Sequence, residues 1–236
     1  MSLRLAAHRM RSNLLRRIIA AGPDRRTRLH DEKGNFIGLR RLVQSGPRAI
    51  SSGLLRLAFG YRPATPWISY AAIDLLESYL HPNSRVLEFG SGMSTVWLGK
   101  RAGEVHSIED SVSWHARVAQ LVAKAQLRNV HLYFAEQIEA YSRIAPADSS
   151  GYDLILVDGN YRHRCTLDAL PLLRAGGVFY LDNSDRGVNS RDNDTRMAEA
   201  AALDFARERG ADVRWFTDFA PTQFFVQQGL MIKLPS

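Results

Sequence analysis

The sequence contains one cysteine, Cys165, among 236 residues, and no apolar run near the roughly 18 residues that cross a bilayer. A single cysteine excludes a disulfide framework and a cysteine-rich zinc module, and it fits a reducing cytoplasm. The seven histidines form no H-x₃-H pair, so no zinc site is predicted. A content of 45% hydrophobic and 23% charged residues excludes intrinsic disorder of the whole chain.

Acidic residues are scarce in the first quarter of the chain. Residues 1–62 carry 14 Lys and Arg against 3 Asp and Glu, a balance of +11. Residues 63–236 carry 17 against 21, a balance of −4. The overall charge of +7 therefore belongs to a basic N-terminal extension, and the body is mildly acidic. We expect two parts, an extension of residues 1–62 and a domain of residues 63–236.

Apolar residues recur at three- and four-residue steps near the start of the chain, and arginines fill most of the intervening positions. This spacing predicts an amphipathic helix that ends near residues 20–23. Three interpretations remain open for it. Residues 1–20 contact an anionic membrane surface, pack on the domain or on a second copy in a homodimer, or form an organellar transit peptide. Residues 21–62 are predicted to be irregular and to wrap the surface.

Short apolar runs alternate with helical stretches from residue 63 onward. The alternation predicts an α/β fold, a Rossmann-like doubly wound sheet of about seven strands. The last two strands have too short a connection for a crossover helix, so we expect an antiparallel hairpin. The predicted strands are 85–89, 104–109, 129–134, 153–158, 178–182, 212–218 and 225–234. The predicted helices are 66–80, one from Gly92 to about Arg101, 112–126, 163–174 and 195–209, with Trp97, Trp114 and Trp215 assigned to the core.

A glycine-rich turn, VLEFGSGMST at residues 86–95, follows the first predicted strand. Glu109 ends the next strand, where an acid accepts the hydroxyls of a ribose. A dinucleotide site would have a third glycine where Thr95 stands. Glu88, two residues before Gly90, would repel a pyrophosphate, but it attracts the amino group and sulfonium of S-adenosylmethionine. The turn therefore favours that cofactor over a dinucleotide.

The E-x-G-x-G pattern followed by a strand-end acid resembles motif I of the class I S-adenosylmethionine-dependent methyltransferases. Over residues 66–234 the chain is most similar to small-molecule O-methyltransferases of the catechol and caffeoyl-CoA type and to their sugar-modifying relatives. The resemblance implies that Glu88, Gly90 and Gly92 hold the amino acid end of the cofactor. It implies that the hydroxyl of Ser94 or Thr95 contacts the carboxylate of the cofactor and that Glu109 contacts its ribose. The full set of implied cofactor contacts is Ser69, Glu88, Gly90, Ser91, Gly92, Ser94, Thr95, Glu109, Ala135, Glu136, Gln137 and Asp158.

Acidic and amide residues end the fourth and fifth predicted strands, at Asp158 and at Asp182 and Asn183. Their oxygen atoms are the ligands that Mg²⁺ and Ca²⁺ prefer. The resemblance implies that this trio holds a divalent ion, because GG-x₄-DN at residues 176–183 matches the metal-dependent enzymes. Such an ion would lower the pKa of an acceptor hydroxyl. The alternative is that Asp158 borders the cofactor and that the other two begin a turn.

The general base differs from the catechol-type pattern. The lysine that those enzymes place three residues after the first metal ligand is Tyr161 here. His163 and Asp158 are the candidate catalytic residues, although His163 could also begin a helix without a catalytic role. Arg162 either binds an anionic substrate group or is solvated.

We expect methyl transfer to a small hydroxylated substrate, a sugar unit or a secondary metabolite, assisted by Mg²⁺. Two alternatives stay open. The chain could be a nucleic-acid methyltransferase or binder that uses the basic extension, although the acidic body argues against it. It could also be an inert cofactor-binding interaction module. We expect a cytoplasmic protein that contacts a membrane peripherally if residues 1–20 bind one.

Overall fold

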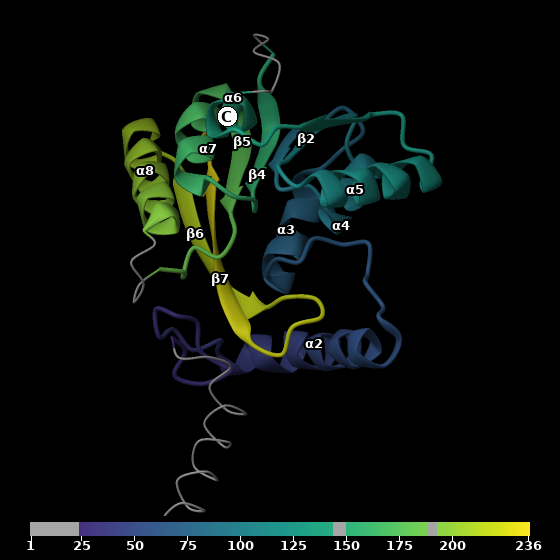
Figure 1. Cartoon of the computed structure of the whole chain (residues 1–236). Helices are drawn as coiled ribbons and strands as arrows, with labels where there is room; N and C mark the ends of the chain where they lie inside the picture. Colours follow the sequence, from purple (N-terminus) through teal and green to yellow (C-terminus); the bar gives the residue numbers. More distant parts are fainter. Residues whose placement is uncertain (1–23, 144–149, 188–192) are drawn as a thin grey trace, which may run out of the picture.

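The computed structural model describes residues 24–143, 150–187 and 193–236, so the amphipathic helix predicted near the N-terminus lies outside the described residues. The described residues form one seven-stranded sheet with helices on both faces (Figure 1). The strand order is β3-β2-β1-β4-β5-β7-β6. The strands are β1 Arg85–Phe89, β2 Glu104–Glu109, β3 Val130–Phe134, β4 Tyr152–Val157, β5 Leu173–Leu181, β6 Asp212–Phe219 and β7 Val226–Lys233.

The final hairpin has the predicted geometry. Strand β7 runs antiparallel to both of its neighbours, β5 and β6, whereas β1 to β5 pair in parallel. Residues 220–225 are too few to form a crossover helix, so β7 must turn back alongside β6. The predicted doubly wound sheet is confirmed.

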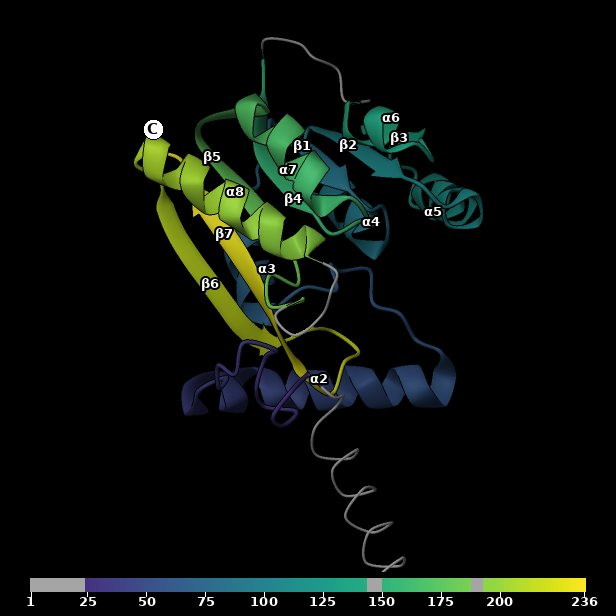
Figure 2. The same cartoon turned by 60° about the vertical axis from the view of Figure 1, so that its left-hand side comes forward.

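Helices cover both faces of the sheet. One face carries α3 (Tyr70–Tyr79), α4 (Met93–Gly99) and α5 (Val112–Lys124) (Figures 1 and 2). The other carries α6 (Ile138–Arg143), α7 (Arg162–Ala169) and α8 (Asp194–Arg209). Alternate residues of β1 reach opposite cores, since Val86 packs with the α3 and α4 side and Leu87 packs with the α6 to α8 side.

The extension contains a helix that the sequence did not predict. Helix α2 (Leu39–Phe59) replaces much of the irregular segment expected over residues 21–62. Gly46, Pro47 and Gly53 obscure the helical pattern in the sequence, because glycine and proline disfavour helix interiors. The tertiary contact explains Gly53, since a Cβ there would lie 2.4 Å from the ring of Phe224. Figure 2 shows α2 running across the end of β6 and β7.

Smaller differences concern where elements begin and end. Helix α3 begins at Tyr70 rather than at residue 66, because the Ser69 hydroxyl accepts a hydrogen bond from the Ala72 amide (3.2 Å) and caps the helix. Helix α7 ends at Ala169, and a 3₁₀ turn (Leu170–Leu172) leads into β5. Helix α6 was not predicted. Within the described ranges, no helix is both long and apolar enough to cross a membrane.

Candidate functional site

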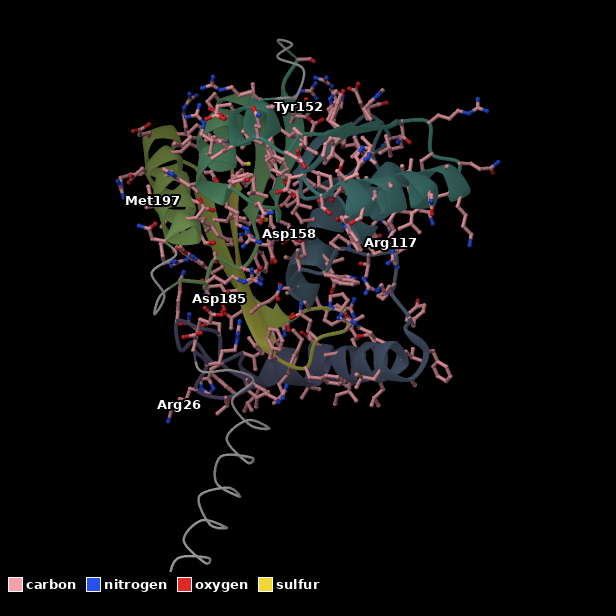
Figure 3. The ribbon with its side chains drawn as sticks, viewed as in Figure 1. Arg26, Arg117, Tyr152, Asp158, Asp185 and Met197 are labelled. Atoms are coloured by element: carbon pink, nitrogen blue, oxygen red, sulfur yellow. The ribbon has the colours of Figure 1, made fainter. Side chains whose placement is uncertain are left out.

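A cavity of about 870 Å³ opens at the carboxyl ends of the central strands. This is the edge at which doubly wound sheets bind their ligands. Figure 3 shows Asp158 at this edge, between the strand ends and α2. The predicted site residues that line the cavity are Gly90, Ser91, Gly92, Ser94, Glu109 and Asp158.

Glu88 lies behind the glycine turn and is fully buried. Its Oε2 accepts hydrogen bonds from the hydroxyls of Thr95 and Ser107, each at 2.5 Å. Its Oε1 has no hydrogen-bond partner among the described residues. Burial raises the pKa of Glu88 to about 7, against the opposing effect of the nearby hydroxyls. A buried carboxyl oxygen without a partner fits the cationic amino group of S-adenosylmethionine.

The structure distinguishes between Ser94 and Thr95, the two residues whose hydroxyls were candidates for contact with the cofactor carboxylate. Thr95 is fully buried, and its hydroxyl donates to Glu88 while it accepts from the Gly92 amide (2.8 Å). Thr95 therefore braces the turn and is not among the residues that line the cavity. Ser94, one residue earlier at the start of α4, does line it.

Gly90 is required by a contact between two turns. Its φ is +92°, and a Cβ on it would lie 2.6 Å from the backbone nitrogen of Gly159, in the turn after β4. A Cβ on Gly159 would in turn lie 2.1 Å from the hydroxyl of Tyr141. Gly92 has no such contact, because a Cβ there would meet only the Ser94 hydroxyl, at 3.7 Å, and the open space leaves room for a ligand.

Glu109 at the end of β2 is held in one orientation. Its Oε2 accepts a hydrogen bond from the Ser91 hydroxyl (3.1 Å), and its Oε1 accepts one from the Ser111 amide (2.9 Å). Burial raises its pKa above the usual value. Trp114 donates its indole N–H to the Ser91 carbonyl (2.7 Å) and also lines the cavity. The assignment of Trp114 to the core is therefore wrong.

Other residues implied by the resemblance are not among those lining the cavity. Ser69 is fully buried and caps α3. Ala135 is buried in the core, and its amide donates to the Glu109 carbonyl (3.0 Å). Glu136 is exposed. A cofactor role for these three residues stays a prediction.

Arg162 lies among the three predicted metal ligands. Its Nη2 donates to Oδ1 of Asp158 and to Oδ1 of Asn183, both at 3.3 Å. Its Nη1 donates to the backbone carbonyl of Asp182 (3.1 Å), and its Nε donates to the Gly159 carbonyl (3.0 Å). The side chain is only 7% exposed. Of the two interpretations of Arg162, the solvated side chain is wrong, and binding of an anionic substrate group stays a prediction.

The arrangement around Arg162 does not fit a divalent ion. The sheet brings Asp158, Asp182 and Asn183 together as the sequence predicted, but the Asp158 carboxylate, the Asn183 amide oxygen and the Asp182 backbone carbonyl all accept from one fixed guanidinium. An added divalent cation would lie beside that positive charge and would be repelled by it, because the dielectric constant in a buried site is low. The metal role of the trio is thus opposed by a residue whose importance the sequence did not reveal.

The two carboxyl groups differ in their surroundings. Asp182 is 2% exposed, and burial together with the nearby Asp158 raises its pKa well above the usual value. Burial also raises the pKa of Asp158, while Arg162 lowers it. Asp158 lines the cavity and pairs with Arg162 (3.3 Å), and the guanidinium favours the charged form of Asp158.

The other candidate base is placed elsewhere. His163 is not among the residues that line the cavity. It lies in the first turn of α7, where its backbone amide donates a hydrogen bond to Oδ1 of Asp194 (3.2 Å). Tyr161, which stands where catechol-type enzymes have lysine, does line the cavity. Of the two predicted catalytic residues, only Asp158 faces the space where a substrate would bind.

Comparison with known proteins now adds to this geometry. Residues 87–184 match a family model described as a methyltransferase domain. Curated protein sequences give no match. Among solved structures, the O-methyltransferase TomG from Streptomyces achromogenes, involved in tomaymycin synthesis and in complex with SAM, is 16% identical. The alignment covers 85% of this chain and 97% of that one, with a TM-score of 0.61.

Two further structures have the same fold. An O-methyltransferase from Bacillus cereus in complex with SAH is 17% identical, with 84% of this chain and 98% of that chain covered and a TM-score of 0.61. An rRNA methylase from Streptococcus thermophilus is 15% identical, with 76% and 100% covered and a TM-score of 0.53. These likenesses show the fold, which small-molecule and RNA enzymes share. Residues 87–184 of the chain therefore form a methyltransferase domain, and the glycine turn, Glu109 and Asp158 of the cavity all lie within it.

Proposed function

We propose that this enzyme transfers a methyl group to a hydroxyl oxygen of a small acceptor, a sugar unit or a hydroxylated secondary metabolite, without a divalent ion. The observation that carries the proposal is Asp158, a carboxylate at the cavity wall paired with the buried guanidinium of Arg162. Asp158 is in place to accept the proton of the substrate hydroxyl, and Arg162 favours the charged form of Asp158.

The cofactor end of the proposal uses residues on one side of the cavity. Glu88 offers its unpaired Oε1 to a cationic amino group, and Glu109 offers a fixed carboxylate to ribose hydroxyls. Gly92 and Ser94 line the space between them. When bound, S-adenosylmethionine supplies a methyl group on a positively charged sulfur.

Asp158 performs the proton transfer in this proposal. The acceptor oxygen forms a bond to the methyl carbon as the carbon–sulfur bond breaks, and the bonding electron pair stays on sulfur. The hydroxyl proton passes to the carboxylate of Asp158. Arg162 keeps that carboxylate oriented through its 3.3 Å contact and through the Gly159 and Asp182 carbonyls. Arg162 thus provides the positive charge that the sequence analysis assigned to Mg²⁺.

The polar lining of the cavity supports a hydroxyl-rich acceptor. The residues beyond the cofactor side include Glu32, Asp110, Asn160, Arg186 and Asp194. Such side chains donate to and accept from sugar hydroxyls. Three carboxylates among them would repel a polyanion, which disfavours RNA or DNA as the acceptor.

The test is transfer of radiolabelled methyl from S-adenosylmethionine to a panel of saccharides, glycosides and phenols, with RNA as a comparison. We expect labelled product from a hydroxylated small molecule in the presence of EDTA. Asp158→Asn should lower turnover by about a hundredfold or more, because the amide cannot accept the proton. Its affinity for S-adenosylhomocysteine should stay close to that of the native enzyme by calorimetry.

Two results would overturn the proposal. Transfer to RNA alone would replace the acceptor class. Native turnover by Asp158→Asn would remove Asp158 as the base. Loss of S-adenosylhomocysteine binding in that variant would instead place Asp158 in the cofactor site, as the sequence analysis also allowed.

A further inference from the structure

Helix α2 exposes a row of large apolar side chains. Leu39, Val43, Ile50, Leu54 and Leu57, the α2 row, are each between 55% and 75% exposed. At 100° per residue these five positions fall within an arc of about 60° on the helix surface. Phe59 at the end of α2 and Tyr61 beyond it are also exposed. Contiguous exposed apolar side chains of this kind mark interaction sites.

The domain holds α2 by a neighbouring face of small residues, whose centre lies about 90° around the helix from the row. Ser45, Gly46, Ala49 and Gly53 are the buried residues of α2. The Ser45 hydroxyl donates to the buried Asp218 carboxylate (2.9 Å), and Gly53 faces the ring of Phe224. An amphipathic helix normally buries its large apolar residues. Here the small face is fixed against the domain, so the α2 row cannot rotate inward.

The surrounding charge indicates an anionic partner. Residues 24–62 carry nine Lys and Arg against three Asp and Glu, a balance of +6, and Arg40 is exposed on α2 next to the row. A symmetric contact between two copies would set this positive charge against itself. A helix with an apolar row and an adjacent arginine in a basic segment instead matches the surface of a bilayer that contains anionic lipids.

The position of α2 relative to the cavity fits this arrangement. Helix α2 lies along one side of the molecule in both views (Figures 1 and 2). Glu32 and Trp67, which lie before and after α2 in the chain, both line the cavity. Arg26, which is labelled in Figure 3, lies on the same side of the molecule as α2.

We propose that the α2 row inserts into the surface of an anionic membrane, with the cavity of the enzyme beside the bilayer. The apolar side chains enter the headgroup region, and Arg40 contacts lipid phosphates. The contact is peripheral and reversible, because the row covers one face of one helix. It is independent of residues 1–20, whose membrane role is a separate prediction.

The experiment is flotation of the full chain with vesicles of phosphatidylcholine in which about a third of the lipid is phosphatidylglycerol. The test variant carries Val43→Ser, Ile50→Ser and Leu57→Ser. The matched control carries Leu167→Ser and Met197→Ser, which remove exposed apolar side chains from α7 and α8. We expect the native chain and the control to bind, and the test variant to bind at least about tenfold more weakly. Pure phosphatidylcholine vesicles should bind the native chain weakly.

Melting temperatures and solution masses are measured on the same samples. All three chains should melt within a few degrees of one another, because the replaced side chains are exposed. The proposal is overturned if the native chain does not bind anionic vesicles or if the test variant binds as well as the control. It is also overturned if the substitutions convert a dimer to a monomer, since the α2 row would then be a contact between copies.

Discussion

Glu88 is a carboxyl group that the fold removes from water and leaves with one oxygen unpaired. Thr95 and Ser107 hydrogen-bond to Oε2, and Oε1 has no partner among the described residues. With a pKa of about 7, the group changes charge near neutral pH. In the proposed cofactor site only the charged form attracts the amino group, so the proposal predicts that cofactor affinity depends on pH.

The affinity for S-adenosylhomocysteine should rise as the pH increases from 5.5 toward 7 and level off between pH 7 and 8, as Glu88 of the free protein loses its proton. Glu88→Gln should bind more weakly at pH 8 and should lack this rise. Calorimetric titrations of both proteins across the range provide the measurement. A flat profile for the native protein would show that Glu88 does not face the amino group.

The same shift predicts the stability of the cofactor-free protein. The folded pKa of about 7 lies above the ordinary value of 4.5, so the folded protein binds more protons than the unfolded chain between these values. Stability should therefore fall as the pH rises through this interval. At pH 8 the cofactor-free Glu88→Gln variant should melt at a higher temperature than the native protein. A lower melting temperature would contradict the charge assignment.

Arg162 gives a third prediction at the scale of residues. Arg162→Met should lower the free energy of unfolding by about 3 kcal/mol, because Asp158 and the carbonyls of Gly159 and Asp182 lose a buried donor. Arg162→Lys should not restore it fully, because one ammonium group cannot replace the planar fork. Urea denaturation measures both effects. In the native enzyme EDTA should leave turnover unchanged, whereas loss of turnover that Mg²⁺ restores would establish a metal site.

At the scale of elements, α2 shows how tertiary contact overrides local preference. Its interior contains Gly46, Pro47 and Gly53, yet the helix runs unbroken from Leu39 to Phe59. Small residues allow it to lie close to the hairpin that joins β6 and β7. The contact fixes which face of the helix is exposed.

Gly53→Val should destabilise the protein by about 1–3 kcal/mol, because the new side chain would overlap the ring of Phe224. Gly46→Ala is the matched control. Its Cβ would meet only a Leu42 methyl group at 3.7 Å, so the higher helix propensity of alanine should leave stability equal or improved. Urea denaturation of the two variants gives the comparison. Equal stability of Gly53→Val and the native protein would show that α2 does not pack as described.

At the scale of the whole molecule, the extension is joined to the body by buried polar contacts. Asp31 is fully buried and accepts hydrogen bonds from Thr217 (2.8 Å) and Gln228 (3.1 Å). Arg25 forms an ion pair with the buried Asp185 (3.5 Å). Removing the extension would leave these partners in the body without their hydrogen bonds.

A chain of residues 63–236 should therefore melt at a lower temperature than the full chain and should expose the end of β6 and β7. Thermal unfolding followed by circular dichroism measures the difference. An unchanged melting temperature would support the independent domain that the sequence analysis expected. The truncated chain should also bind S-adenosylhomocysteine less tightly if loss of Glu32 and its neighbours opens the cavity.

The sequence by itself determined the sheet and the cofactor turn. Apolar runs and turn residues are local signals, so β1 and β2 were predicted with the bounds that the structure has, and Gly92 and Glu109 were placed at the cavity. The short connection before β7 sufficed to predict its direction. These features depend on residues close together in the chain.

Only the tertiary structure decided which distant groups meet. The register of β2 with β3 sets His106 beside His131, and Glu104 lies 3.0 Å and 3.7 Å from their Nε2 atoms, a cluster that no sequence motif indicated. In the same way, the pairing of β4 with β5 brings Arg162 to Asp182 and Asn183. A guanidinium at the start of a helix looks solvated in the sequence. Its burial and its partners follow from strand order, because hydrogen bonds form between groups that the fold places within about 3 Å of each other.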